Sequence, residues 1–194
     1  MKNVRLTVLA GVNGAGKTTL RQRQAQLFAG DVIVDADDYL RRAHGNWRRG
    51  NDRMTAVMAA RCAVGEQLAA HQAVTWETPL GGTARTALRL VAQAHKYKMT
   101  VRLIGVLVPD ATTALQRVTA RFQQGGFGGS QVDVEARFTR GIANLQTVQQ
   151  VADEVLLYTN QDRLRLAYEE RAGVVFRDDL AAQLAGSSVG KYFL

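Results

Sequence analysis

Apolar residues follow two alternating patterns along the chain: short continuous runs, and longer stretches with helical spacing. The continuous runs are typical of parallel strands that are covered on both faces. They predict five strands: VRLTVLA (4–10), DVIVDA (31–36), AVTWET (73–78), MTVRLIGVLV (99–108) and EVLLYTN (154–160). We therefore expect an α/β fold, with a parallel five-stranded sheet and helices on both faces.

The stretches between these runs predict helices over about 17–28, 51–71 and 83–96, and two more after Pro109 and after residue 131. Asp110 is placed to cap the fourth helix, which explains it better than a metal-holding role. The residues expected to follow helical spacing are Met54, Val57, Met58, Cys62, Val64 and Leu68, then Leu115, Val118 and Phe122, then Val134, Phe138, Ile142, Leu145 and Val148. Cys62 is expected to face a helix core.

A glycine-rich break, QQGGFGGSQ (123–131), separates the last two helices. The tail predicts a small hairpin and a short helix at 162–185. With no internal repeat and no boundary in composition, we expect one domain over 1–194, with a lid region at about 117–141.

The chain has 25 Lys and Arg against 17 Asp and Glu, a net charge of +8. This charge favours anionic partners such as nucleotides, phosphorylated metabolites, nucleic acid or an acidic protein. Five arginines gather in RRAHGNWRRGNDR (41–53), either as a solvated surface or as a substrate-gathering or partner-binding patch. A single cysteine, no cleavable signal and no long apolar run predict a cytoplasmic protein with no membrane contact.

The first predicted strand leads into GVNGAGKT (11–18), which matches G-x-x-x-x-G-K-[ST] at every position. Glycines let the backbone turn so that N–H groups point at phosphate oxygens, and the following helix adds its positive end. We expect ATP and Mg²⁺ as cofactors, with Lys17 on the β- and γ-phosphates and Thr18 on the metal. The expected nucleotide-binding residues of this loop are Gly11, Asn13, Gly14, Ala15, Gly16, Lys17, Thr18 and Thr19.

Acidic residues end the second and third predicted strands, where functional groups of parallel sheets gather. They are Asp35, Asp37 and Asp38, then Glu77. Phosphoryl transfer needs a carboxylate to accept the proton of the acceptor hydroxyl, and we prefer Asp37 for it. Asp35 is expected to point into the protein or toward Lys17, and Asp38 to cap a helix or lie at the surface. The alternative is that none of the three is catalytic.

Arginines flank the glycine-rich break. Arg117 and Arg121 share one helix face, and Arg137 and Arg140 lie three apart on the next helix. Arginine binds phosphate bidentately, so these four could hold phosphates when a lid closes and excludes water. We expect Arg117 and Arg121 to be catalytic; the alternative for each arginine is a solvated face.

The segments AGVNGAGKTT, DADDY, WETPLGG, LQRVTARFQQGG, FTRGIANL and ADEVLLYTN occur in this order. In them the chain resembles the zeta toxin family over about 4–179. These are bacterial P-loop kinases, and several phosphorylate UDP-N-acetyl sugars. The resemblance implies ATP as donor and an acidic antitoxin as a possible protein partner.

Residue roles carried over by this resemblance follow the matching segments. Asp37 matches the base that deprotonates the sugar 3′-hydroxyl. Glu77, with Thr78 in the same ETPLGG segment, matches the part that binds the sugar nucleotide, and we assign Arg137 and Arg140 to the acceptor too. Arg117 and Arg121 match the region that stabilises the transferring phosphoryl group, and Asn160 matches a position near the nucleotide. Phe127 departs from the histidine that many members carry there.

Three functions remain open from sequence. The first is an ATP-dependent phosphotransferase acting on a small-molecule hydroxyl, with a nucleotide sugar as the implied acceptor. The second is a nucleotide-binding toxin or interaction protein with low turnover. The third is a nucleic-acid end kinase, which the low aromatic content of 7% disfavours because few rings are available to stack on bases.

Overall fold

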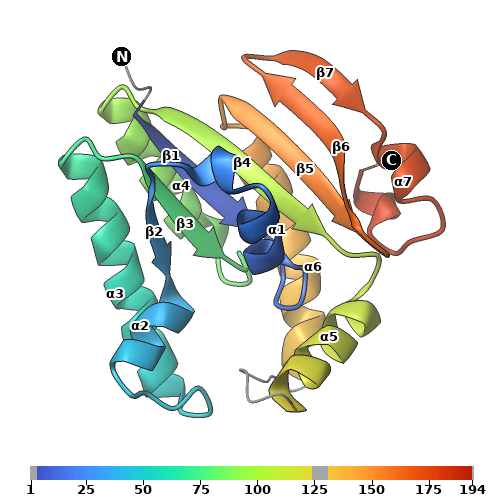
Figure 1. Cartoon of the computed structure of the whole chain (residues 1–194), viewed down its shortest axis with the longest axis horizontal. Helices are drawn as coiled ribbons and strands as arrows, with labels where there is room; N and C mark the ends of the chain where they lie inside the picture. The colour runs from blue at the N-terminus through green and yellow to red at the C-terminus, as the bar shows by residue number, and fades with distance from the viewer. Residues whose placement is uncertain (1–3, 124–130, 194) are drawn as a thin grey trace.

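A computed structural model of the chain describes residues 4–123 and 131–193, and the side chains of the second segment from residue 135 onward. Seven strands form one sheet in the order β2-β3-β1-β4-β5-β6-β7 (Figure 1). They are β1 (Arg5–Ala10), β2 (Val32–Asp35), β3 (Val74–Thr78), β4 (Thr100–Leu107), β5 (Glu154–Asn160), β6 (Leu164–Arg171) and β7 (Val174–Asp178). The glycine-rich break, with Phe127, and the Val134 side chain lie outside the described residues.

The first five strands pair in parallel, which confirms the predicted strands to within one residue at each end. The prediction that the sheet has only five strands, all parallel, is nevertheless wrong, because the sheet has seven strands. The C-terminal hairpin does not stand apart, because β6 pairs antiparallel with β5, and β7 with β6. The result is a mixed sheet, in which the hairpin supplies hydrogen-bond partners to what would otherwise be the exposed edge of β5.

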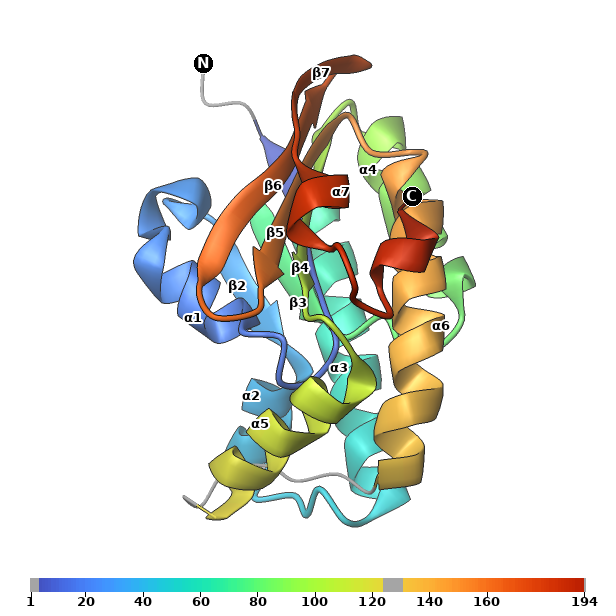
Figure 2. The ribbon, with the colours of Figure 1, turned by 90° about the vertical axis from the view of Figure 1, so that its right-hand side faces the viewer.

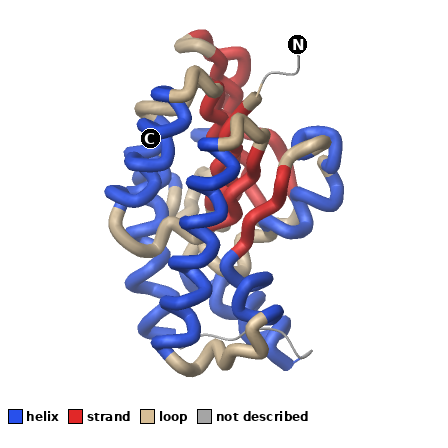
Figure 3. Tube along the Cα trace, turned by 90° about the vertical axis from the view of Figure 1, so that its left-hand side faces the viewer, coloured by secondary structure: helices blue, strands red, loops and turns tan. Residues whose placement is uncertain are grey.

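Helices cover both faces of the sheet, as predicted. Helices α3 (Gly50–Ala69), α4 (Ala84–Lys96) and α6 (Gln131–Gln149) line one face, and α1 (Lys17–Arg23) with the 3₁₀ helix η1 (Ala25–Phe28) lies on the other (Figures 2 and 3). The remaining elements are α2 (Ala36–Arg42), α5 (Ala111–Gln123), α7 (Leu180–Gln183) and the 3₁₀ helix η2 (Gly190–Tyr192). No helix in the described part of the chain is long and apolar enough to cross a membrane.

The core lies between the sheet and the α3–α4–α6 layer. Helix α6 buries the stripe predicted for it, as far as its side chains are described: Phe138, Ile142, Leu145 and Val148. These side chains sit at spacings of four, three and three residues, so one helix face reaches the sheet along most of its length.

Helix α3 buries Val64 and Leu68 as expected, but its first half turns a different face inward from the one expected. Met54 is 61% exposed, Met58 is 52% exposed, and Cys62 is exposed too. The buried stripe is Ala56, Ala60, Val64 and Leu68. The apolar positions formed two stripes with equal helical spacing, and the small alanines of the second allow the closer approach to α2, α4 and the sheet. On α5, Phe122 is 40% exposed instead of buried.

Asp110 caps α5, as predicted. Its Oδ1 accepts a hydrogen bond from the Thr113 backbone N at 2.6 Å. This bond satisfies one of the backbone donors that the first turn of a helix leaves without a partner.

Replacing Asp110 by alanine should lower the free energy of unfolding by about 1 kcal/mol, because the Thr113 N–H loses its acceptor. The matched control is Asp110→Asn, whose side-chain oxygen can still accept that bond and should retain most of the stability. Urea unfolding followed by circular dichroism measures both. Equal losses in the two variants would contradict the cap.

Candidate functional site

The glycine loop turns tightly between β1 and α1 and lies against three other elements. Gly11 N donates to Thr78 O of β3 at 3.3 Å. Gly14 and Gly16 adopt left-handed backbone conformations, with φ of 83° and 103°. A Cβ at Gly16 would lie 2.5 Å from Asn160 Nδ2 of β5, and the left-handed backbone there would strain any other residue.

Lys17 is the buried centre of the site. Its Nζ donates to Gly11 O at 2.8 Å and to Val12 O at 3.5 Å. Burial lowers the pKa of Lys17, while the carboxylates of Glu77, Asp35 and Asp37 raise it. The charge of Arg121 lowers it further. Groups from four elements therefore act on one ammonium, and the structure brings together most of the residues predicted for the site.

Two carboxylates meet where β2 and β3 end side by side, since Asp35 and Glu77 are partners in register. Asp35 is the N-cap of α2, and its Oδ1 accepts from Asp37 N at 3.0 Å. Burial, followed by the nearby Glu77, raises the pKa of Asp35 to about 6. Asp37 lies in the first turn of α2, and Asp38 pairs with Arg41 at 2.8 Å near the surface. The capping role considered for Asp38 thus belongs to Asp35.

Glu77 is buried and contacts two residues of α1. Thr18 Oγ1 donates to its Oε1 at 3.4 Å, and Arg21 Nε lies 3.6 Å from its Oε2. Sequence reasoning missed Arg21, although its place one turn after Thr18 on α1 is a usable signal. Glu77 Oε2 is buried without a hydrogen-bond partner. This oxygen has an ion pair with Arg21 but no hydrogen bond, and the Glu77 carboxylate lies beside the Thr18 hydroxyl. Such an oxygen pair would suit Mg²⁺, which binds through few protein oxygens and many phosphate and water oxygens.

Among the described residues no group of three or more His, Cys, Asp or Glu side chains could hold a metal ion. A structural metal site built from the protein alone is therefore missing from this part of the chain.

The two arginines of α5 have different surroundings. Arg117 Nη2 donates to Gln161 O at 2.6 Å, while its Nη1 is buried without a hydrogen-bond partner. The neighbouring Asn160 Nδ2 donates to Ala15 O at 2.7 Å, so Arg117 lies where the β5–β6 turn meets the glycine loop. Arg121, one turn later and exposed, is close enough to Lys17 to affect its pKa.

The other predicted residues surround this centre less tightly. Thr19 and Asn13 are exposed on α1 and on the loop. Thr78 Oγ1 accepts from Leu80 N at 3.2 Å and so shapes the turn after β3. Arg137 lies against that same turn, where a Cβ at Gly81 would be 3.2 Å from its Cβ. Arg140 is exposed, and its Nε donates to Ala136 O of its own helix at 3.2 Å.

Asn144 is a positioning residue that the sequence did not reveal. Its Nδ2 donates to Leu80 O at 2.6 Å and to Gly82 O at 2.8 Å, which ties α6 to the loop after β3. The available signal was an amide beside the buried stripe, between Ile142 and Leu145 in the sequence. Such an amide could equally have faced solvent.

A strand, a glycine loop and a helix that buries its first lysine, at the carboxyl edge of a mainly parallel sheet, define a P-loop nucleotide-binding protein. Residues 6–148 match the model of a family described as AAA domain, and the chain belongs to this family. The sequence has no significant match among curated proteins.

Solved structures share the fold at low sequence identity. One, from the PezAT chromosomal toxin–antitoxin system of the human pathogen Streptococcus pneumoniae, has a TM-score of 0.68 at 16% identity, over 100% of this chain and 77% of that chain. AvrRxo1-ORF1:-ORF2 with ATP has a TM-score of 0.73 at 13% identity, over 93% and 62%. Shikimate kinase from Acinetobacter baumannii in complex with shikimate has a TM-score of 0.50 at 20% identity, over 79% of this chain and 83% of that chain. The fold is thus that of P-loop kinases.

The raised pKa of Asp35 predicts a pH-dependent stability. Between about pH 4 and pH 6 the unfolded chain loses this proton while the folded protein keeps it, so the group's stabilising effect is lost as pH rises. Asp35→Asn keeps a side-chain acceptor for Asp37 N and removes the charge. It should raise the free energy of unfolding at pH 8 by on the order of 2 kcal/mol, and by much less at pH 4.

Denaturant unfolding of the nucleotide-free protein at the two pH values tests this. Asp38→Asn is the control, because Asp38 forms only a surface ion pair and should change stability little at either pH. A gain that is equal at pH 4 and pH 8 would show that the carboxyl of Asp35 titrates normally.

Proposed function

We propose that this protein is an ATP-dependent phosphotransferase that moves the γ-phosphoryl group to a hydroxyl of a small molecule. The observation that carries the proposal is the arrangement around Lys17. Carboxylates of Asp35, Asp37 and Glu77 act on its ammonium from β2, α2 and β3, and Arg121 acts on it from α5. A motor or switch needs no acceptor-side base of this kind.

The donor half of the site is the glycine loop. The Lys17 ammonium is held by the loop's own carbonyls, Gly11 O and Val12 O. Phosphate oxygens of ATP would take over this ammonium, since a charged acceptor binds it more strongly than a carbonyl. Thr18 and Glu77 would hold Mg²⁺, which neutralises charge on the β- and γ-oxygens when bound.

The acceptor half lies at the ends of β2 and β3. Asp37 is the proposed base, and the Asp35 carboxyl fixes its backbone N. The acceptor oxygen forms a bond to the γ-phosphorus, the bond to the bridging oxygen breaks, and ADP leaves with that electron pair. The proton of the acceptor hydroxyl passes to the Asp37 carboxylate. Glu77, Thr78 and Arg137 surround the acceptor in this proposal, with Arg140 at its periphery.

The resemblance to zeta toxins supports a UDP-N-acetyl sugar as acceptor. Two structural neighbours come from toxin–antitoxin or paired-protein systems, and one of them was solved with ATP. They also support a second form of the proposal, in which an acidic antitoxin binds the basic protein and inhibits it. A partner of this kind would act on the same enzyme and leaves the chemistry unchanged.

The central experiment incubates the protein with ATP, Mg²⁺ and a panel of UDP-sugars, free sugars and nucleosides. Mass spectrometry then looks for an acceptor that gains one phosphate. Asp37→Asn should lower the transfer rate by about 10²- to 10⁴-fold, because the acceptor proton loses its base. Asp38→Asn, one residue further along the same helical turn, is the matched control and should keep the rate within about twofold.

No phosphorylated product from any acceptor would refute the proposed function. Full activity in Asp37→Asn would refute only the assignment of the base. Asp35→Asn then becomes the next variant, because Asp35 also acts on Lys17.

Substitution of the two arginines of α5 should affect different kinetic constants, KM for Arg117 and kcat for Arg121. Arg117 holds the turn beside Asn160 and has an unpartnered buried N–H, so Arg117→Ala should raise the KM for ATP several-fold. Arg121 acts on Lys17, so Arg121→Ala should lower kcat, by roughly 10²-fold or more, with a smaller effect on KM. Arg177→Ala, on β7 at the far edge of the sheet, is the control for loss of one exposed arginine. Identical effects of Arg117→Ala and Arg121→Ala would contradict this division.

A further inference from the structure

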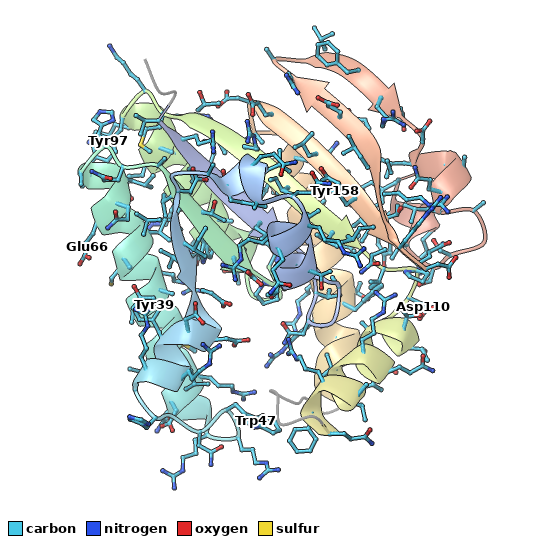
Figure 4. The ribbon with its side chains drawn as sticks, viewed as in Figure 1. Tyr39, Trp47, Glu66, Tyr97, Asp110 and Tyr158 are labelled. Carbon is cyan, nitrogen blue, oxygen red and sulfur yellow. The ribbon has the colours of Figure 1, made fainter. Side chains whose placement is uncertain are left out.

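An aromatic contact joins the two segments that carry the proposed base and the proposed phosphate-binding arginine. Trp47 lies in the connection between α2 and α3, and Phe122 lies at the end of α5. Their ring centroids are 5.7 Å apart at an interplanar angle of 77°, the edge-to-face arrangement that aromatic pairs favour. Figure 4 shows Trp47 at the end of the molecule where these two segments approach each other.

Arg48 adds a cation to this pair. Its guanidinium carbon lies 5.0 Å from the Trp47 ring centroid and 5.8 Å from that of Phe122. A guanidinium within about 6 Å of an aromatic face is attracted by the ring. The contact also explains why the apolar Phe122 is only partly exposed at a helix end that would otherwise face solvent. We call Trp47, Arg48 and Phe122 the aromatic bridge.

The backbone that presents Trp47 is tied down on both sides. Asn46 N donates to Asp52 Oδ2 at 2.8 Å, and Arg48 N donates to Asn46 Oδ1 at 2.9 Å. Gly45 N donates to Leu40 O of α2 at 2.9 Å. The position of Trp47 is therefore coupled to α2, the helix that carries Asp37.

The opposite end of the bridge belongs to α5, one residue after Arg121. Helices α2 and α5 extend from the same end of the sheet on either side of the glycine loop (Figure 1). The charges of Asp37 and Arg121 both act on Lys17. Helices α2 and α5 are therefore connected twice, through Lys17 at the site and through the aromatic bridge at the end of the molecule.

We propose that the aromatic bridge is a positioning device for phosphoryl transfer, which holds Asp37 and Arg121 on opposite sides of the γ-phosphoryl group and keeps water from replacing the acceptor. This inference rests on the proposed function. If the bridge is lost, a water oxygen attacks the γ-phosphorus, ADP leaves with the electron pair of the broken bond, and the water proton passes to a carboxylate or to solvent. The products change from phosphorylated acceptor plus ADP to inorganic phosphate plus ADP.

The test is the ratio of phosphorylated acceptor to inorganic phosphate, measured from the same reaction for the wild type and for Trp47→Ala and Phe122→Ala. Both variants should lower this ratio by roughly 10- to 100-fold, because misplacing reacting groups by about 1 Å has effects of this size. The double variant should be no worse than either single one. Trp47→Phe keeps a ring at the contact and should restore most of the ratio.

Phe176→Ala is the matched control, since Phe176 is 65% exposed on β7 at the far edge of the sheet. It loses the same ring and should leave the ratio and the thermal unfolding temperature unchanged. An unchanged ratio in both bridge variants would overturn the proposal. So would a ratio that falls only in step with a loss of folded protein, as thermal unfolding would show.

The outcome also separates this inference from the proposed function. If the wild type phosphorylates no acceptor, the proposed function fails, and hydrolysis of ATP without acceptor becomes the measurement. A several-fold faster release of phosphate by both variants would then support a bridge that excludes water. An equal rate in the wild type and the variants would overturn it.

Discussion

The burial of one ammonium group constrains the whole site. Lys17 begins α1 beneath the loop, where desolvation makes its charge costly unless anions or carbonyls compensate it. The sheet supplies carboxylates from the ends of β2 and β3, and the loop supplies two carbonyls. These contacts order the loop, which lowers the entropic cost of binding an anion there.

Sheet topology explains why these groups meet. β1 lies between β3 and β4 in the sheet, so the loop after β1 is bordered by the ends of these neighbours. The end of β3 carries Glu77, and β2, which pairs with β3, places Asp35 beside it. On the other side, α5 follows β4 and returns its arginines toward the loop. The residues proposed for the acceptor and those proposed for the phosphates thus come from opposite halves of the sheet.

The sequence predicted the parallel core, the glycine loop and the cap of α5 well, because each leaves a local pattern. It failed where two patterns were equally good or where contacts are distant. The Met54 and Ala56 stripes of α3 have the same spacing, and β6 is too polar to be assigned to the large sheet. Arg21, Asn144 and the Trp47–Phe122 contact depend on partners that come together only in the folded protein.

The hydrogen bond from Asn160 to Ala15 spans 145 residues of the chain. The loop near the start of the sequence is therefore completed by a strand near its end, and β1 gains its second neighbour only after β4 has been made. During synthesis, an emerging chain that carries the whole glycine motif still lacks the residue that steadies it. Nucleotide would then be bound fully only by chains that have been made and folded as far as Asn160, so the ligand stabilises these and leaves shorter ones unprotected.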